Sequence, residues 1–185
     1  MCEKSLPFTY AVDFVDVLGI PRYARDECIA EIFVLKPHGS FNWGLCPSSY
    51  EVTIYAPAQD IQMYERLHNA KRRCHSERHV CEPLLIPPTR KKDLDIPALR
   101  KVWEKASDFL SQATELHVIG YSAPEADKGA QELLSQALKP RVSKLKKVVL
   151  ANKSANTRIK GLLGITNCEE YNTFEEYLKK YEFSA

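Results

Sequence analysis

The chain has 185 residues, 44% of them hydrophobic, which is enough for one packed core in a single domain covering residues 1–185. The formal net charge is only +2 with both signs interspersed, so no global field favours nucleic acid or an anionic membrane surface as a partner. No stretch approaches the roughly 18 apolar residues of a membrane span, and the first residues contain no apolar signal-peptide core. We therefore expect a cytoplasmic protein.

The N-terminal half is predicted to contain one clear strand and a small irregular module. The strand is EIFVLKP, residues 31–37, whose apolar side chains run into a proline. The module covers about residues 46–82, is polar, and includes a candidate short helix at 61–70. The chain has six cysteines, which are scattered and follow no secretion signal, so we expect thiols or metal ligands rather than disulfides.

The C-terminal half alternates helices and strands. Apolar residues at three-and-four spacing predict an amphipathic helix over about 97–113, which leads into a short buried strand at 116–119. A second helix over about 126–138 precedes a second buried strand at 148–151. Strands that alternate with helices pair in parallel through right-handed crossovers. The fold class expected is therefore α/β, with a partial Rossmann-like parallel sheet, flanking helices and the small irregular insertion.

Two further helices are predicted near the end of the chain. Residues 155–163 are expected to form a short helix that closes near Gly164. The last helix opens with a capping box of Thr173 and Glu176. The side chains expected to face the core from this helix are Phe174, Tyr177, Leu178 and Tyr181.

Polar residues and glycines follow the predicted strands at the edge where parallel sheets bind ligands. They are His38, Gly39 and Ser40 after the first strand, Gly120, Tyr121 and Ser122 after the second, and Asn152 after the third. A glycine admits a ligand close to the backbone, N–H groups that precede a helix attract phosphate, and an asparagine carboxamide can pair with a ribose hydroxyl. We expect one cleft to collect these residues.

Several segments, taken in order, resemble the later part of a sirtuin-like domain of the silent-information-regulator family. They are HGSFNW, the cysteine-bearing module, CEPLLIPPTRKK, the helix with ELHVIGYSAPEAD, and VVLAN, and they extend from about residue 33 to 164. The resemblance implies that NAD is the ligand. It also implies nicotinamide-releasing NAD hydrolysis as the chemistry of the complete domain.

The resemblance assigns a role to residues after each predicted strand. It makes His38 the catalytic base beside the nicotinamide ribose, for which Gly39 leaves room. Histidine suits this role because an imidazole accepts protons near neutral pH. By the same resemblance Gly120 and Ser122 contact the dinucleotide, and Asn152 holds the adenine-side ribose. The alternative for His38 is a hydrogen-bonded structural histidine at a strand end.

The resemblance also implies a structural zinc ion in the module. Family members often bind zinc with two C-x-x-C pairs, because four thiolates satisfy its tetrahedral geometry. In this chain the first pair has Ser49 in place of its second thiol, and CHSERHVC stands at the second pair. The implied zinc-ribbon-like site consists of Cys46, Cys74, His79 and Cys81, with His75 as a substitute. The alternative is thiols that pack without a metal.

The chain departs from the family in its glycines. Sirtuin-like domains open with a glycine-rich loop that grips the pyrophosphate, but none of the seven glycines here forms a G-x-G pair. The HG motif also arrives only 38 residues into the chain. We therefore expect the C-terminal portion of such a domain, completed by an N-terminal segment or a partner chain that supplies the loop.

The segment LLIPPTRKK helps to choose among the activities of the family. Pro87 and Pro88 cannot donate the backbone hydrogen bonds with which a deacylase strand holds its peptide. This favours the divergent members that hydrolyse NAD, among them antiphage effectors. The alternatives are an NAD-dependent protein deacylase, a non-catalytic nucleotide-binding or protein-interaction domain, and an unrelated α/β enzyme whose nucleophile is Cys74, Cys81 or Cys168.

Overall fold

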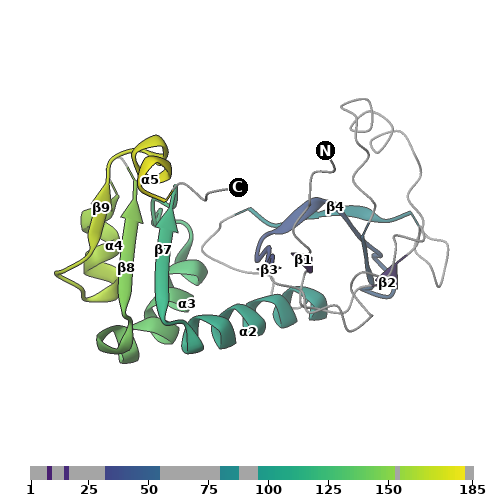
Figure 1. The fold of residues 1–185 in the computed structure, drawn as a ribbon. Coiled ribbons are helices and arrows are strands. Elements are labelled where there is room, and N and C mark those ends of the chain that lie inside the picture. Colours follow the sequence, from purple (N-terminus) through teal and green to yellow (C-terminus); the bar gives the residue numbers. More distant parts are fainter. Residues whose placement is uncertain are drawn as a thin grey trace. The chain divides into compact units, whose positions relative to one another are not determined.

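The computed structural model describes residues 8–9, 15–16, 32–54, 80–87, 96–152 and 155–181. These residues belong to two compact units (Figure 1). Unit 1 lies within Met1–Pro87 and Asp93–Lys105, and unit 2 lies within Pro88–Lys92 and Ala106–Ala185. No helix in these described ranges is long and apolar enough to cross a membrane.

Short strands form the sheets of unit 1. The strands are β1 (Phe8–Thr9), β2 (Val15–Asp16), β3 (Ile32–Phe33), β4 (Gly39–Leu45), β5 (Val52–Ile54) and β6 (Glu82–Leu85). Strand β4 pairs antiparallel with β5 and β6, while β2 pairs parallel with β5, and β1 pairs parallel with β3. The predicted strand at 31–37 is therefore paired as a strand only at Ile32–Phe33, and the HGSFNW motif from Gly39 onward belongs to β4. The module that we expected to be irregular contributes β5 to this sheet.

The core of unit 1 forms where this sheet meets helix α2 (Pro97–Gln112). Trp43 of β4 is completely buried, and Leu99 and Val102 of α2 pack in the same cluster. The predicted amphipathic helix is confirmed, with Pro97 at its first position, where a missing N–H costs nothing. The apolar face of α2 thus fixes the sheet that carries the HGSFNW motif.

Unit 2 contains a three-stranded parallel sheet in the order β7, β8, β9. Strand β7 (Glu115–Ile119) pairs with β8 (Lys147–Ala151) over their whole length, and both were predicted. Strand β9 (Glu169–Tyr171) pairs with the other edge of β8 and was not predicted. The parallel sheet places the carboxyl ends of all three strands at one edge.

Helices cover both faces of this sheet. They are α3 (Lys128–Leu138), which continues into the 3₁₀ turn η1 (Lys139–Lys144), α4 (Asn156–Leu163) and α5 (Phe174–Lys180). Residues of α3 and α4 pack with alternate side chains of β7 and β8, while Tyr177 of α5 packs on the opposite face against Val149 and Ala151. Figure 1 shows α5 beside the arrowheads of β7 and β8. The predicted α/β class is confirmed, and the arrangement is compatible with a partial Rossmann-like fold.

The ends of the last two helices follow the predicted signals. Gly164 ends α4 in the left-handed conformation, with φ 70°. At the start of α5 the Glu176 N–H donates to Thr173 Oγ1 over 3.1 Å, and Glu176 Oε2 accepts from the Asn172 N–H over 2.9 Å. The prediction that all four apolar residues of this helix face the core is wrong, because Phe174 is 51% and Leu178 is 40% exposed.

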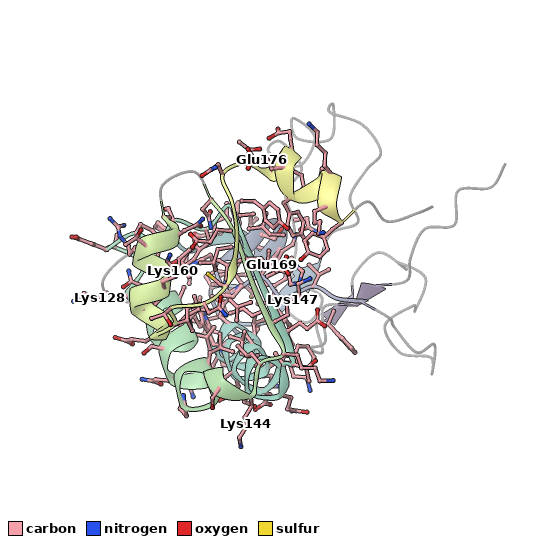
Figure 2. All side chains as sticks on the ribbon, turned by 60° about the vertical axis from the view of Figure 1, so that its left-hand side comes forward. Lys128, Lys144, Lys147, Lys160, Glu169 and Glu176 are labelled. Atoms are coloured by element: carbon pink, nitrogen blue, oxygen red, sulfur yellow. The ribbon has the colours of Figure 1, made fainter. Side chains whose placement is uncertain are left out.

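Two lysines bind the acidic residues of β9 from neighbouring elements. Glu169 pairs with Lys147 of β8 over 3.3 Å, and Glu170 pairs with Lys160 of α4 over 2.7 Å. Figure 2 labels Lys147, Lys160 and Glu169. The hydrogen bond from Tyr181 to Glu169, with help from Lys147, lowers the pKa of that carboxyl below its ordinary value. These pairs explain how a strand with two adjacent glutamates joins the sheet.

Candidate functional site

An open pocket of about 450 Å³ lies at the carboxyl ends of the strands of unit 2. Its wall consists of Ile119, Gly120, Ala151, Asn152, Asn172, Thr173 and Phe174. These residues are the ends of β7 and β8 and the positions just after all three strands. Ligands of parallel α/β sheets bind at this edge, and the volume lies in the range of small-molecule sites. The pocket therefore unites Gly120 and Asn152, two of the predicted cofactor-binding residues.

Asn152 is fixed by hydrogen bonds to both neighbouring strands. It is only 8% exposed, its backbone N–H donates to the Tyr171 carbonyl over 3.1 Å, and its Nδ2 donates to the Val118 carbonyl over 3.3 Å. An amide nitrogen carries two hydrogens and its oxygen has two lone pairs. The carboxamide is thus held in place with the capacity to donate to and accept from a ligand hydroxyl. Gly120 beside it has a φ of 68° and no side chain to narrow the pocket.

The loop after β7, which carries Ser122, is held in a strained shape. Ala123 has a φ of 48° and is completely buried, a conformation that costs about 1–3 kcal/mol in a residue other than glycine. Arg158 Nη1 donates to the carbonyls of Ala123 over 3.2 Å and Ser122 over 3.4 Å, and Gln131 Nε2 donates to those of Ala123 and Pro124. Arg158, which the sequence did not single out, thus lies against the backbone of the predicted serine.

Tyr121 supports this loop from the core side. Its ring packs against the core of unit 2, and its hydroxyl donates to Asp127 Oδ2 over 3.4 Å. Burial, together with the charge of Asp127, raises the pKa of Tyr121 to about 12, so the phenol stays protonated at neutral pH. Among the described residues, the pocket wall includes neither Tyr121 nor Ser122.

His38 lies in unit 1, in the turn that leads into β4. The Gly39 N–H donates to the Lys36 carbonyl over 2.9 Å to close the turn, and the His38 carbonyl accepts from the Ile86 N–H over 2.9 Å. The imidazole meets the ring of Trp103 edge to face, with 5.8 Å between centroids. The Trp103 indole N–H also donates to the Pro37 carbonyl over 2.9 Å. Residues far along the chain therefore fix the turn that presents His38.

The two residues after His38 are constrained by contacts within unit 1. Gly39 has a φ of 80°, and a Cβ there would overlap the Leu84 carbonyl oxygen, so the position requires glycine. Ser40 Oγ donates to Asn42 Oδ1 over 2.7 Å and accepts from Lys36 Nζ over 2.9 Å. The predicted residues His38, Gly39 and Ser40 thus belong to unit 1, while the other predicted cofactor-binding residues belong to unit 2.

Two of the four predicted zinc ligands lie side by side. Cys46 and Cys81 are buried, with exposed fractions of 0% and 4%, and they form their own small cluster next to the ladder pair Leu45–Glu82. The other predicted ligands, Cys74 and His79, and the substitute His75, are outside the described residues. Within the described ranges no group of three or more His, Cys, Asp or Glu side chains is placed to hold a metal ion.

Three residues of the pocket wall escaped the sequence interpretation. They are Asn172, Thr173 and Phe174. Thr173 was assigned only a capping role and Phe174 a place in the core. The available signal was the strand-end rule, since these residues follow β9 just as Gly120 follows β7 and Asn152 follows β8. The strand-end rule identifies these residues only when β9 is known to be a strand.

No protein-family model, curated protein or solved structure matches the chain. Function is therefore inferred from the residues of the pocket and from those around His38. The pocket wall carries amide, hydroxyl and apolar groups and no charged side chain. Such a wall suits an uncharged portion of a ligand that forms hydrogen bonds. Proton transfer requires a titratable side chain, such as that of His38.

Proposed function

We propose that this chain is the later part of a sirtuin-like NAD-binding domain, whose complete form hydrolyses NAD to nicotinamide and ADP-ribose. The observation that carries the proposal is the pocket at the strand ends of unit 2, whose wall includes both Gly120 and Asn152. These are two positions at which the family resemblance expects the dinucleotide. A carboxamide that can both donate and accept matches the vicinal hydroxyls of a ribose.

The reaction breaks the bond between the ribose C1′ carbon and the nicotinamide ring nitrogen. The electron pair of this bond moves to the nicotinamide ring and cancels its positive charge, while C1′ becomes electron-poor. A water oxygen then bonds to C1′, and the proposal gives His38 the role of accepting the proton of that water. General-base catalysis of this kind contributes about 10²–10⁴-fold to a rate. A Gly-rich phosphate loop from an N-terminal segment or a partner chain completes the domain.

Replacing His38 with alanine tests the catalytic part of the proposal. The chain is incubated with NAD and the released nicotinamide is quantified. We expect slow release by the wild-type chain, which has no G-x-G loop of its own to hold the pyrophosphate, and a rate lower by about 10²-fold or more in His38→Ala because its general base is lost. NAD affinity should change little, which separates a lost base from a lost binding site.

The matched control is Glu104→Ala, at an exposed position of α2 in the same unit. This variant should release nicotinamide at the wild-type rate. Equal rates in wild type and His38→Ala would reject His38 as the base. If the wild-type chain binds NAD but releases no nicotinamide, catalysis by this chain is contradicted and the non-catalytic alternative is favoured.

We further propose a structural zinc ion bound by Cys46, Cys74, His79 and Cys81. The juxtaposition of Cys46 and Cys81, buried at adjacent strand ends, supports half of this ligand set. Zinc bound there would join the module to the sheet, as four-coordinate structural sites do. Metal analysis of the purified chain should find about one zinc ion per chain.

Serine variants provide the matched comparison for zinc. Cys46→Ser and Cys81→Ser should each lose the metal, while Cys168→Ser, a change at a half-buried thiol of unit 2, should retain it. A wild-type chain purified without chelators and lacking zinc contradicts the site. So does zinc retained by both of the first two variants.

A non-catalytic nucleotide-binding domain is the second candidate function. The absence of a G-x-G pair in the sequence favours this candidate, because such a pair forms the loop whose adjacent backbone N–H groups bind the pyrophosphate. In this case the pocket of unit 2 binds the nucleotide and His38 takes no part in chemistry. The nicotinamide assay described above separates the two candidates.

A further inference from the structure

Phe174 is an apolar residue left exposed at the edge of the pocket. It is the first residue of α5, its side chain is 51% exposed, and it lines the pocket beside Thr173. A single exposed phenylalanine is common on protein surfaces, but this one borders a pocket whose wall also includes Asn152 and Thr173. An aromatic ring in such a position offers a flat face for a planar ligand.

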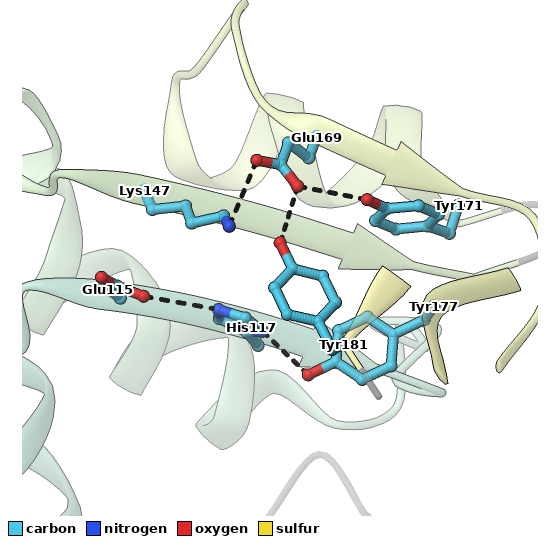
Figure 3. Close-up of polar contacts among 7 residues, drawn as sticks. All are labelled: Glu115, His117, Lys147, Glu169, Tyr171, Tyr177 and Tyr181. Carbon is cyan, nitrogen blue, oxygen red and sulfur yellow. Dashed lines mark hydrogen bonds and ion pairs between the residues drawn. The ribbon is translucent and has the colours of Figure 1, made fainter. Parts of the chain in front are cut away.

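The ring of Phe174 is supported from behind by other rings. It stacks on Tyr177 with 6.1 Å between centroids and 15° between planes, and Tyr177 stacks on Tyr181 with 4.8 Å and 28°. We call Phe174, Tyr177 and Tyr181 the aromatic stack. The Tyr177 hydroxyl is hydrogen-bonded to His117 Nδ1 over 2.9 Å, and the Tyr181 hydroxyl donates to Glu169 over 2.6 Å (Figure 3). Both tyrosines are thereby anchored to the sheet.

An aromatic side chain that is already ordered loses little conformational entropy when a ligand stacks on it, so the contacts of the aromatic stack favour binding. The stack is anchored at two strands, since His117 belongs to β7 and Glu169 belongs to β9. Phe174 therefore places at the pocket a ring that stacks on the anchored ring of Tyr177.

The remaining wall defines what kind of planar ligand the pocket accepts. The seven lining residues are all uncharged, so the positively charged nicotinamide ring of NAD would find no acidic partner there. A purine is neutral and has a large aromatic face. Asn152, with both a donor and an acceptor, lies in the same pocket and suits the ribose attached to such a base.

We propose that Phe174 is a specificity-determining residue of this site, on whose ring the adenine base of the nucleotide stacks. The inference rests on the proposed function in that it concerns the same pocket. It adds a base-recognition element that the sirtuin resemblance did not assign to this chain. Adenosine should bind the pocket even without phosphates or nicotinamide.

Calorimetric titration measures how tightly the full chain binds adenosine, ADP-ribose and nicotinamide mononucleotide. Base–aromatic stacking energies predict that Phe174→Leu, which keeps apolar bulk but loses the ring, weakens adenosine and ADP-ribose binding about 5- to 150-fold. Phe174→Trp should keep wild-type affinity or exceed it. Leu178→Ala, at a 40% exposed apolar position of the same helix, is the matched control and should bind like wild type.

Nuclear magnetic resonance supplies a readout that a purely structural role would not change. The adenine H2 and H8 protons should shift upfield when adenosine binds the wild-type chain, because they lie over the face of an aromatic ring. This shift should be lost in Phe174→Leu at saturating adenosine. It should persist in Leu178→Ala.

The outcomes separate this inference from the proposed function. If NAD binds and its binding depends on Asn152 but not on Phe174, the stacking role is overturned while the NAD-binding proposal stands. If adenosine binds in a Phe174-dependent manner but NAD does not bind, the stacking role is supported and the NAD-binding proposal is contradicted. Binding of nicotinamide mononucleotide without binding of adenosine overturns the inference.

Discussion

Gly39→Ala is expected to destabilise unit 1 by about 2–5 kcal/mol, a large part of the stability of an ordinary domain. The left-handed φ of 80° alone costs about 1–2 kcal/mol in a residue with a Cβ. The added methyl group also overlaps the Leu84 carbonyl oxygen. That oxygen cannot move aside easily, because Gly39 is paired with Leu85 in the ladder and the Ile86 N–H donates to His38.

Urea denaturation followed by tryptophan fluorescence measures this loss. Both tryptophans of the chain, Trp43 and Trp103, lie in unit 1, so the signal reports on that unit. The matched control is Gly120→Ala in unit 2, followed by far-ultraviolet circular dichroism. Gly120 also has a positive φ, of 68°, but an added Cβ meets no atom within 4 Å, so the expected cost is only about 1–2 kcal/mol. Equal losses in the two variants would show that the contact with Leu84 is not what requires glycine.

Asn152→Ala is expected to weaken NAD binding by about 10- to 100-fold, the loss that follows when two hydrogen bonds to a ligand are removed. The carboxamide is the polar side chain that the resemblance assigns to a ribose, and it lies in the pocket at the strand ends. Its bond to the Val118 carbonyl is also lost, which should cost about 1 kcal/mol of stability. Calorimetric titration with NAD measures the first effect, and urea denaturation measures the second.

Asn167→Ala serves as the control, because Asn167 is an exposed asparagine of the same unit that does not line the pocket. It should bind NAD like the wild-type chain. Asn152→Asp adds a second comparison, since a carboxylate retains the acceptor but cannot donate to Val118 or to a ligand. NAD affinities that are unchanged in both Asn152 variants would remove this residue from the binding site.

The sequence predicted those elements that are specified by local signals, that is, by residues within the element or next to it. The periodic apolar face of α2 and the proline at its start are such signals, and so are the glycine after α4 and the capping pair of Thr173 and Glu176. Strand β8 was recognised from its continuous apolar run at 148–151, and β7 from a short run rich in strand-forming residues that ends at Gly120. The edge at which Gly120 and Asn152 meet follows from these two strands alone.

Strand β9 could not be predicted because its stability comes from residues far away in the sequence. Two adjacent glutamates are unfavourable in an apolar strand pattern, and among the described residues they form ion pairs with Lys147 and Lys160, which lie on other elements. The exposure of Phe174 was missed for a related reason. Its helix lies at the end of the sheet, so part of its apolar face borders the pocket rather than the core.

The requirement for Gly39 is a further example of a nonlocal cause. The sequence interpretation assigned this glycine to the approach of a ribose. The structure supplies a constraint within unit 1, the carbonyl of Leu84, which comes into contact only because β4 pairs with β6. Pairing between strands so distant in the chain is not visible in local patterns.

Titration of the full chain with NAD, observed through its backbone and side-chain amide signals by nuclear magnetic resonance, tests the central claim most directly. The pocket at the strand ends of unit 2 predicts that the largest shifts occur at Gly120, at the Asn152 side-chain amide and at Thr173. Saturable shifts at these positions would support NAD binding in this pocket. If NAD shifts no signal there, or only signals of unit 1, the account is contradicted.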